Sequence, residues 1–348
     1  MVMIGIDPHK RSHTAVALSK NADVLGTRMV PARNGQVGEL VAWADGLDDP
    51  CRTWAIESAG GMGYLLAQQL LAAGESVIDI PAVLASRVRV LSSGKSNKND
   101  PNDAYSVALA ALHTRSPIVV RVEDHATILR LLSRRHTQLA RSFNKTACRL
   151  HALMCEVVPG GLTKQVVVAQ ASALLDQVEI TTAVTAERVR VARDMVADLA
   201  WVNEQRRRSL ARIHDAVQAS GTTLTEIFGV GDVIAATLIG HTGNPARFAN
   251  ADRFAAYNGT APVEFSSGTD KPEVWRLSHR GNRAMNHAIH IAAVTQLRHA
   301  HSPGRAFYDR KREEGMRPKK ALRALKRRIS DVAYRHLVAD ARRTAPHR

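Results

Sequence analysis

The first 120 residues alternate between short apolar stretches and polar turns, and the spacing of their apolar residues follows two periods. Five stretches are continuous or alternating apolar runs, the pattern of β-strands, at 1–7, 13–19, 23–30, 52–58 and 75–81. Three others have apolar residues three or four positions apart, the pattern of helices, at 35–47, 63–74 and 100–113. The resulting order, βββαβαβα, predicts the ribonuclease-H-like fold, in which helices flank a mixed sheet.

Residues 124–220 carry two longer helical patterns. The first has apolar residues at three/four spacing from Leu139 to Val157 and stops at Pro159–Gly161. The second runs from Val191 to Val217 and is interrupted by the charged residues 205–208. Two such stripes around a turn predict an antiparallel helical hairpin. The pattern is equally typical of a dimerising coiled coil and of two core helices in one domain.

The remaining residues, 221–348, predict a mostly helical region. Residues 224–243, LTEIFGVGDVIAATLIGHTG, indicate a helix, a tight glycine turn and a second helix, an arrangement that resembles a helix-hairpin-helix element. The backbone N–H groups at such a helix N-terminus can bind a phosphate. Gly229 and Gly231 are therefore candidate nucleic-acid-binding residues, with plain turn residues as the equal alternative. A basic helical tail follows at 318–338.

The length of 348 residues fits about two or three domains, and we expect them at 1–123, 124–220 and 221–348. A hydrophobic content of 45% excludes wholesale disorder. No window approaches the ~20 consecutive apolar residues of a membrane helix, and the first residues lack a signal-peptide pattern, so a cytoplasmic protein is expected. Cys51, Cys148 and Cys155 form no close pair, which excludes zinc-finger and disulfide scaffolds.

The positive charge grows toward the C-terminus. The chain has 48 Lys and Arg against 32 Asp and Glu, and residues 221–348 alone hold 22 against 11. Most of these cations are arginines, whose planar fork matches phosphate oxygens. A polyanionic partner is expected, nucleic acid rather than membrane, because no basic amphipathic anchor stands out.

Four acidic residues stand where the predicted topology would bring them together. Asp7 ends the first strand, Glu57 ends the fourth, and Asp100 and Asp103 begin the last helix of this domain on one helical face. Clustered carboxylates are the ligands that Mg²⁺ or Mn²⁺ takes in phosphoryl-transfer sites. Lys95 and Lys98 would add positive charge beside the same cleft, unless they belong to a solvated loop.

Each acid also has an ordinary structural explanation. Asp100 before Pro101 fits a helix N-cap, and Asp103 fits a first-turn acid that complements the helix dipole. Asp7 fits a turn cap before Pro8. Glu57 is the hardest to explain by packing, because an apolar strand leads directly into it. The coincidence of all four favours a metal site.

Six blocks of the chain resemble, in order, those of the insertion-sequence one-ten family of transposases. They are GIDPHKRSHTAVAL, AIESAGG, SNKNDPNDAYSVALAA, FGVGDVIAATLIGHTG, AYNGTAPVEFSSG and SHRGNRAMNHAIHIAA. The resemblance implies a RuvC-like domain with a DEDD set of acids, a coiled-coil segment and a C-terminal domain with a serine nucleophile. It also implies oligomers that act on donor and target DNA and are guided by a structured bridge RNA.

Matched by position, the DEDD acids are the four named above. The family serine precedes a glycine, which matches Ser267 before Gly268, with Ser266 adjacent. Without the family, a turn would be the better interpretation of this serine-rich segment. Arg280 and Arg283 lie in the next block, and Arg276 lies two residues before it; all three would neutralise charge on a phosphoryl group. The segment after the serine is less basic than the family pattern.

The resemblance favours a DNA transposase or recombinase in the cytoplasm of a bacterium or archaeon, associated with the nucleoid when active. A RuvC-like nuclease that hydrolyses branched DNA is the first alternative. A non-enzymatic nucleic-acid-binding protein with a decayed site is the second, and the presence of all four acids and the serine argues against it.

Overall fold

The computed structural model describes residues 1–348 apart from 48, 50, 94–99, 116, 163–166, 265–274, 278–280 and 345–348. The side chains of residues 89, 91–93, 263–264, 275–277 and 344 are also outside the description. The chain divides into two compact units, Met1–Glu123 and Asp124–Arg348. Each unit has its own apolar core, so each is described by itself.

The first unit is built on one mixed sheet in the strand order β3-β2-β1-β4-β5-β6. Strands β1 (Val2–Pro8), β2 (Ser12–Leu18) and β3 (Val24–Pro31) form an antiparallel meander. Strands β4 (Arg52–Glu57) and β5 (Val77–Ile80) continue the sheet parallel to β1. This is the ribonuclease-H-like arrangement that the order of elements predicts. The added β6 (Ile118–Val119) has two residues, too few for a periodic signal.

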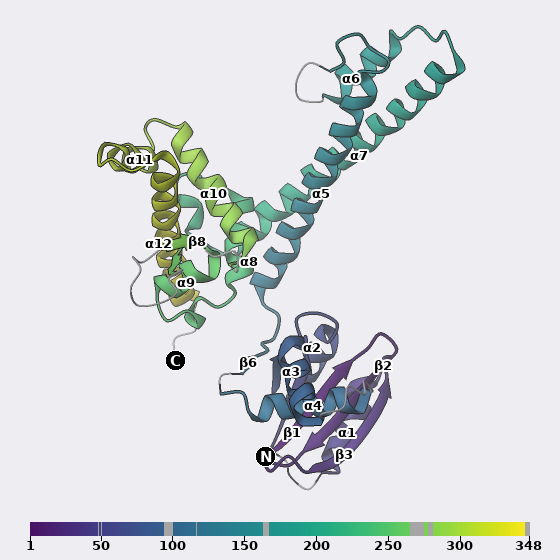
Figure 1. Cartoon of the computed structure of the whole chain (residues 1–348), viewed down its shortest axis with the longest axis vertical. Coiled ribbons are helices and arrows are strands. Elements are labelled where there is room, and N and C mark those ends of the chain that lie inside the picture. The colour runs from purple at the N-terminus through teal and green to yellow at the C-terminus, as the bar shows by residue number, and fades with distance from the viewer. Residues whose placement is uncertain are drawn as a thin grey trace. The chain divides into compact units, whose positions relative to one another are not determined.

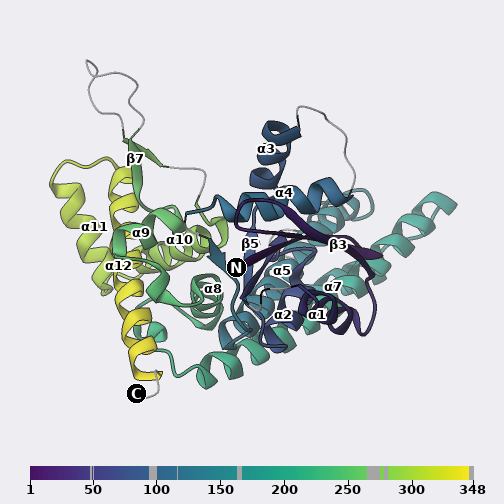
Figure 2. The same cartoon turned by 90° about the horizontal axis from the view of Figure 1, so that it is seen from below.

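Helices cover both faces of this sheet (Figure 2). Helices α1 (Gln36–Asp45) and α2 (Tyr64–Ala72) pack on one face, and α3 (Ala82–Ser93) and α4 (Asp100–Leu112) lie on the other. The sequence pattern did not predict α3. Its Val83 and Val90 are 66% and 70% exposed, so the apolar residues of this helix do not mark a single buried face.

Helix α4 lies unusually close to the central strand. A Cβ atom on Gly5 of β1 would stand 2.2 Å from the carbonyl oxygen of Ala104 and 2.4 Å from the amide nitrogen of Ala108. Only glycine permits this approach, because any side chain would overlap the helix backbone. The small residues Ala104 and Ala108 provide the other half of the contact and are fully buried. The first turn of α4 is thereby held near the end of β1.

The second unit begins with a long helical hairpin (Figure 1). Helices α5 (His125–Met154) and α7 (Ala183–Ala219) run side by side, with the short α6 (Val168–Asp176) at the far end. The pairing is antiparallel, because Leu129 shares a cluster with Val217 while Met154 shares another with Val189. The predicted hairpin is therefore present. Its role as a dimerising coiled coil stays a prediction.

The elements after residue 221 pack around a second core that includes the near end of the hairpin. They are a 3₁₀ turn (Leu224–Glu226), α8 (Asp232–Thr242), a second 3₁₀ turn (Pro245–Arg247), α9 (Ala251–Asn258), β7 (Pro262–Glu264), β8 (Trp275–Leu277), α10 (Arg283–Arg298), α11 (Pro303–Glu313) and α12 (Pro318–Thr344). The sequence predicts a helix as the first part of the helix-hairpin-helix-like element, and the structure has only the 3₁₀ turn Leu224–Glu226 there. Asp340 of α12 accepts bonds from the N–H of Thr223 and from both threonine hydroxyls, Thr222 and Thr223, just before this turn.

The second core contains residues from both sides of position 220, since Leu129 and Ile213 of the hairpin share a cluster with Leu325 of α12. The division at 220 stays a prediction. Among the described residues, no helix is long and apolar enough to cross a bilayer.

Replacing Gly5 by Ala should lower the free energy of unfolding of the first unit by about 1–3 kcal/mol or more, because the new methyl group would push α4 off β1. Urea unfolding of a protein with Trp201 and Trp275 replaced by Phe, so that the fluorescence comes from Trp43 and Trp54 of the first unit, would measure the change. Gly38→Ala is the matched control: Gly38 lies inside α1 with no atom within 4 Å of the added Cβ. It should raise stability by about 0.5–1 kcal/mol. Equal effects of both variants would contradict the close approach.

Candidate functional site

A cavity of about 420 Å³ opens at the ends of the central strands in the first unit. Asp7, Glu57 and Asp103 all contribute to its lining. Asp7 and Glu57 come together because β1 and β4 are parallel neighbours, with Ile6 opposite Ile56. Asp7 directly follows Ile6 in β1, and Glu57 directly follows Ile56 in β4. Two apolar strands thus end in carboxylates at one edge of the sheet.

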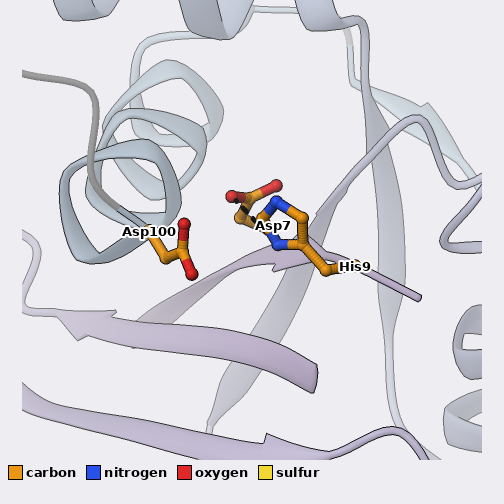
Figure 3. Close-up of side chains that lie close together, drawn as sticks. All are labelled: Asp7, His9 and Asp100. Atoms are coloured by element: carbon orange, nitrogen blue, oxygen red, sulfur yellow. Dashed lines mark ion pairs between the residues drawn. The ribbon is translucent and has the colours of Figure 1, made fainter. Parts of the chain in front are cut away.

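The two acids of α4 approach the same point from the helix. Asp103 is 9% exposed and lines the cavity, and Asp100 lies in the first turn. One carboxylate oxygen of Asp100, one of Asp7 and a ring nitrogen of His9 lie within 4.8 Å of one another. In Figure 3, Asp100 faces the Asp7–His9 pair from the helix end. The structure therefore places all four predicted acids around the end of β1, with Asp7 common to both groups.

His9 is a member of this cluster that the sequence did not single out. Its Nδ1 lies 3.6 Å from Oδ2 of Asp7, and the residue also lines the cavity. The available signal was the spacing Asp-x-His at the end of a strand, with His9 one residue beyond β1. That spacing is too common to identify a ligand without the tertiary structure.

Asp79 supports the turn that follows Glu57. It lies on β5 opposite Ile56, and its carboxylate accepts a hydrogen bond of 2.7 Å from the N–H of Ala59. Burial raises the pKa of Asp79, and the bond from Ala59 opposes that rise. Ser58 adopts a left-handed conformation (φ 51°), which is rare for a residue with a side chain. Asp79 thus fixes the strained turn that presents Glu57, another residue that sequence reasoning missed.

The donor atoms around Asp7 fit a hard divalent cation. Asp7 is only 8% exposed, and a buried carboxylate is costly unless it is hydrogen-bonded, ion-paired or bound to a metal. Octahedral Mg²⁺ holds its ligands at about 2.1 Å, so opposite ligand atoms lie about 4.2 Å apart. Adjacent ligand atoms lie about 3.0 Å apart, so three donor atoms within 4.8 Å of one another would move closer together to share an ion. Carboxylate oxygens with one imidazole also suit Mn²⁺.

The other predicted site residues belong to the second unit or to undescribed segments. Lys95, Lys98, Ser266, Ser267 and Arg280 lie outside the described residues, and Arg276 is described only as backbone in β8. Arg283 is the exposed first residue of α10.

The two glycines predicted to contact nucleic acid differ in their surroundings. Gly229 has φ 81°, and a Cβ there would lie 2.9 Å from the carbonyl oxygen of Ala292 in α10, so packing alone requires glycine. Gly231 precedes α8 and has open space around it. The first residue of α8, Asp232, is ion-paired with His214 at 2.9 Å. Contact of either glycine with a phosphate stays a prediction.

The segment that carries the predicted serine has closely joined ends. A Cβ on Gly281 would lie 2.5 Å from the Cα of Gly259, so the two backbones touch. Asn286 donates through Nδ2 to the carbonyl oxygens of Asn258 and Gly259, at 3.1 and 2.8 Å. The N–H of Asn282 donates to the carbonyl of Tyr257 at 2.7 Å. We call this junction of residues 257–259 with 281–286 the clasp.

Comparison with known proteins gives matches to both units. The DEDD transposase model of IS110 matches residues 4–159, and the model described as "Transposase IS116/IS110/IS902 family" matches residues 221–309. An insertion element IS116 protein of Streptomyces clavuligerus is 25% identical, over 96% of this chain and 94% of its own. An insertion element IS900 protein of Mycobacterium paratuberculosis is 26% identical over the same shares.

Among solved structures, RuvC of Thermus thermophilus, alone and in complex with a Holliday junction substrate, aligns with 34% of this chain. The identities are 16% and 17%, each with a TM-score of 0.27, over 100% and 99% of the RuvC chains. The two family models match 4–159 and 221–309, in the order in which the blocks occur, and the relatives matched over 94% of their length are proteins of insertion elements. The chain belongs to the IS110 family of insertion-sequence transposases.

Proposed function

We propose that this transposase cuts and rejoins DNA with a divalent-cation site in its first unit and a serine nucleophile in its second. The observation that supports the cation site best is the convergence of Asp7, Glu57 and Asp103 on one cavity, with Asp100 beside Asp7. The serine is supported by the family resemblance of the block that contains Ser267 and by the clasp that joins the ends of its segment.

The four acids, with His9, would hold one or two Mg²⁺ or Mn²⁺ ions. A bound ion supplies positive charge that stabilises a phosphoryl group and activates an oxygen nucleophile. Asp7 is central, because it belongs both to the cavity and to the cluster with His9 and Asp100. Asp79 keeps Glu57 in place through the turn after β4.

In the proposed step, the hydroxyl oxygen of Ser267 forms a bond to a DNA phosphorus, and the bond from that phosphorus to one deoxyribose oxygen breaks. The serine proton is lost to a base, and the departing oxygen takes up a proton. The phosphoserine ester retains the bond energy, so reversal with a different DNA end rejoins the strand. Arg276, Arg280 and Arg283 would neutralise charge on the phosphoryl oxygens.

Guidance by a bridge RNA and assembly into an oligomer are part of the same proposal. They rest on the family resemblance and on the excess of 22 cations over 11 acids after residue 221. Both donor and target DNA would be bound chiefly through phosphates. The long α5–α7 hairpin offers an extended surface for a second protomer.

A hydrolytic nuclease is the second candidate. It is favoured by one observation: every acid of the cavity and its cluster comes from the unit Met1–Glu123, so this unit holds a complete set of carboxylates by itself. Such an enzyme would cleave by attack of water and would not need the serine.

Ser267→Ala should abolish a covalent protein–DNA adduct trapped by denaturation, because no oxygen remains to attack the phosphate. Ser266→Ala, the matched control one residue earlier, should keep most of the adduct. Asp7→Asn should remove the adduct and leave DNA binding within about twofold, since Asp7 is a cation ligand in this proposal. Gel electrophoresis after denaturation, with labelled DNA of the element's own end, measures these outcomes.

If the adduct instead depends on Ser266, the nucleophile has been assigned to the wrong residue. Cleavage that continues in both serine variants, without an adduct, would favour the hydrolytic nuclease.

Mn²⁺ should bind the wild-type protein directly, and His9→Ala should weaken that binding by at least about 10-fold, the loss that removal of even an outer-shell partner causes. Electron paramagnetic resonance of free Mn²⁺ during titration measures the affinity without any need for activity. Glu39→Gln, an acid of the same unit outside the cavity, should leave the affinity unchanged. Equal affinity in the wild type and in Asp7→Asn would exclude a cation site here.

A further inference from the structure

Helices α10 and α12 carry basic side chains beside the clasp, and His290 of α10 interacts with Lys326 of α12. His287 and His290 are three apart on α10, and Arg323 and Lys326 are three apart on α12, so each pair shares one helix face. The two helices pack together (Figure 1). We call these four residues the α10–α12 cationic cluster.

Lys326 is the most enclosed member of the cluster and connects it to the clasp. It is half-buried, and its ammonium donates a 2.7 Å hydrogen bond to Oδ1 of Asn286. The same Asn286 holds the carbonyls of Asn258 and Gly259. A single side chain therefore separates Lys326 from the point where residues 260–281 begin and end.

No carboxylate of the described residues forms an ion pair with Lys326. Burial is the main cause that lowers the pKa of Lys326, and the charge of Arg323 lowers it further. Burial likewise lowers the pKa of His290, followed by the charges of Lys326 and His287. The neighbouring groups that lower these two pKa values, Arg323, Lys326 and His287, are all basic side chains.

The next residue along α12 shows the opposite situation. Arg327 is paired with Asp252 at the start of α9 and, at 2.9 Å, with Asp331 one turn ahead. Helix α12 therefore does receive carboxylate partners from its surroundings, but on a neighbouring face. Lys326, on the side that faces α10, has no such partner among the described residues.

A half-buried ammonium beside the guanidinium of Arg323 is unfavourable unless an anion compensates it. Here the protein provides an amide oxygen from Asn286 and no carboxylate among the described residues. A phosphodiester would supply the missing charge: the ammonium offers three donors, and the guanidinium of Arg323 offers a planar fork that matches two phosphate oxygens.

We propose that His287, His290, Arg323 and Lys326 form a binding site for one phosphodiester of DNA, next to the segment that carries Ser267. The inference rests on the proposed function, in which this transposase acts on DNA. It goes further by assigning a phosphate contact to residues outside the acid and serine sites. DNA is favoured over RNA because the clasp joins this cluster to the serine segment, whose proposed substrate is a DNA phosphodiester.

The test compares three variants of the full-length protein by salt-dependent binding to a duplex of the element's own end. The plot of log affinity against log salt should become shallower by about 0.9 in Lys326→Gln, because one phosphate contact is lost. Lys326→Arg should retain the wild-type slope, since the charge remains. Arg327→Gln, the matched control one residue away, should also retain it, because Asp252 and Asp331 already neutralise Arg327.

Thermal melting of each variant separates loss of folding from loss of a contact, since a merely structural role of Lys326 would shift melting and leave the slope unchanged. If Lys326→Gln leaves the slope unchanged while the wild-type affinity falls steeply with salt, the proposed site is wrong and the proposed DNA binding still stands. A wild-type affinity that does not depend on salt would overturn both this site and the proposed phosphate binding. A slope change seen with single-stranded RNA of equal length and not with the duplex would assign the cluster to RNA and overturn the DNA site.

Discussion

The close contact between β1 and α4 is the constraint on which the first unit depends. Gly5 lets the helix backbone lie against the strand, and the buried residues Ala104 and Ala108 complete the fit. Because a helix is rigid over this length, fixing its middle also fixes its first turn. Asp100 and Asp103 are then brought to the end of β1, where Asp7 stands. A contact of Gly5 with the backbone of α4, which involves no charged side chain, thus determines the geometry of the charged cavity.

Most of the sheet and its main helices follow from the spacing of apolar residues, and the reasons for the failures are physical. The five long strands and α1, α2 and α4 have a clear period, whereas α3 follows β5 directly and exposes Val83 and Val90. The 3₁₀ turn at Leu224–Glu226 depends on bonds to Asp340, more than 100 residues away. No local pattern contains such information.

The same distinction applies to the candidate site. Strand ends and helix starts are local signals, so the convergence of Asp7, Glu57 and the α4 acids could be inferred once the topology was assumed. His9 and Asp79 were missed because their importance comes from what they touch. His9 matters because its ring lies close to the carboxylate of Asp7, and Asp79 matters because it accepts a hydrogen bond from the turn after Glu57. The serine assignment came from block resemblance, since a serine-rich turn has no distinctive local chemistry.

The clasp has a consequence for how this protein can vary. Gly259 and Gly281 touch, and β7 pairs with β8 from Pro262 opposite Leu277 to Glu264 opposite Trp275, so the chain leaves and re-enters the second core at one place. The entropy of closing a loop changes by only about 0.6 kcal/mol for each doubling of its length. Related proteins can therefore differ in the number of residues between β7 and β8 at little cost in closure entropy, while the contact of Gly259 with Gly281 keeps the second core the same.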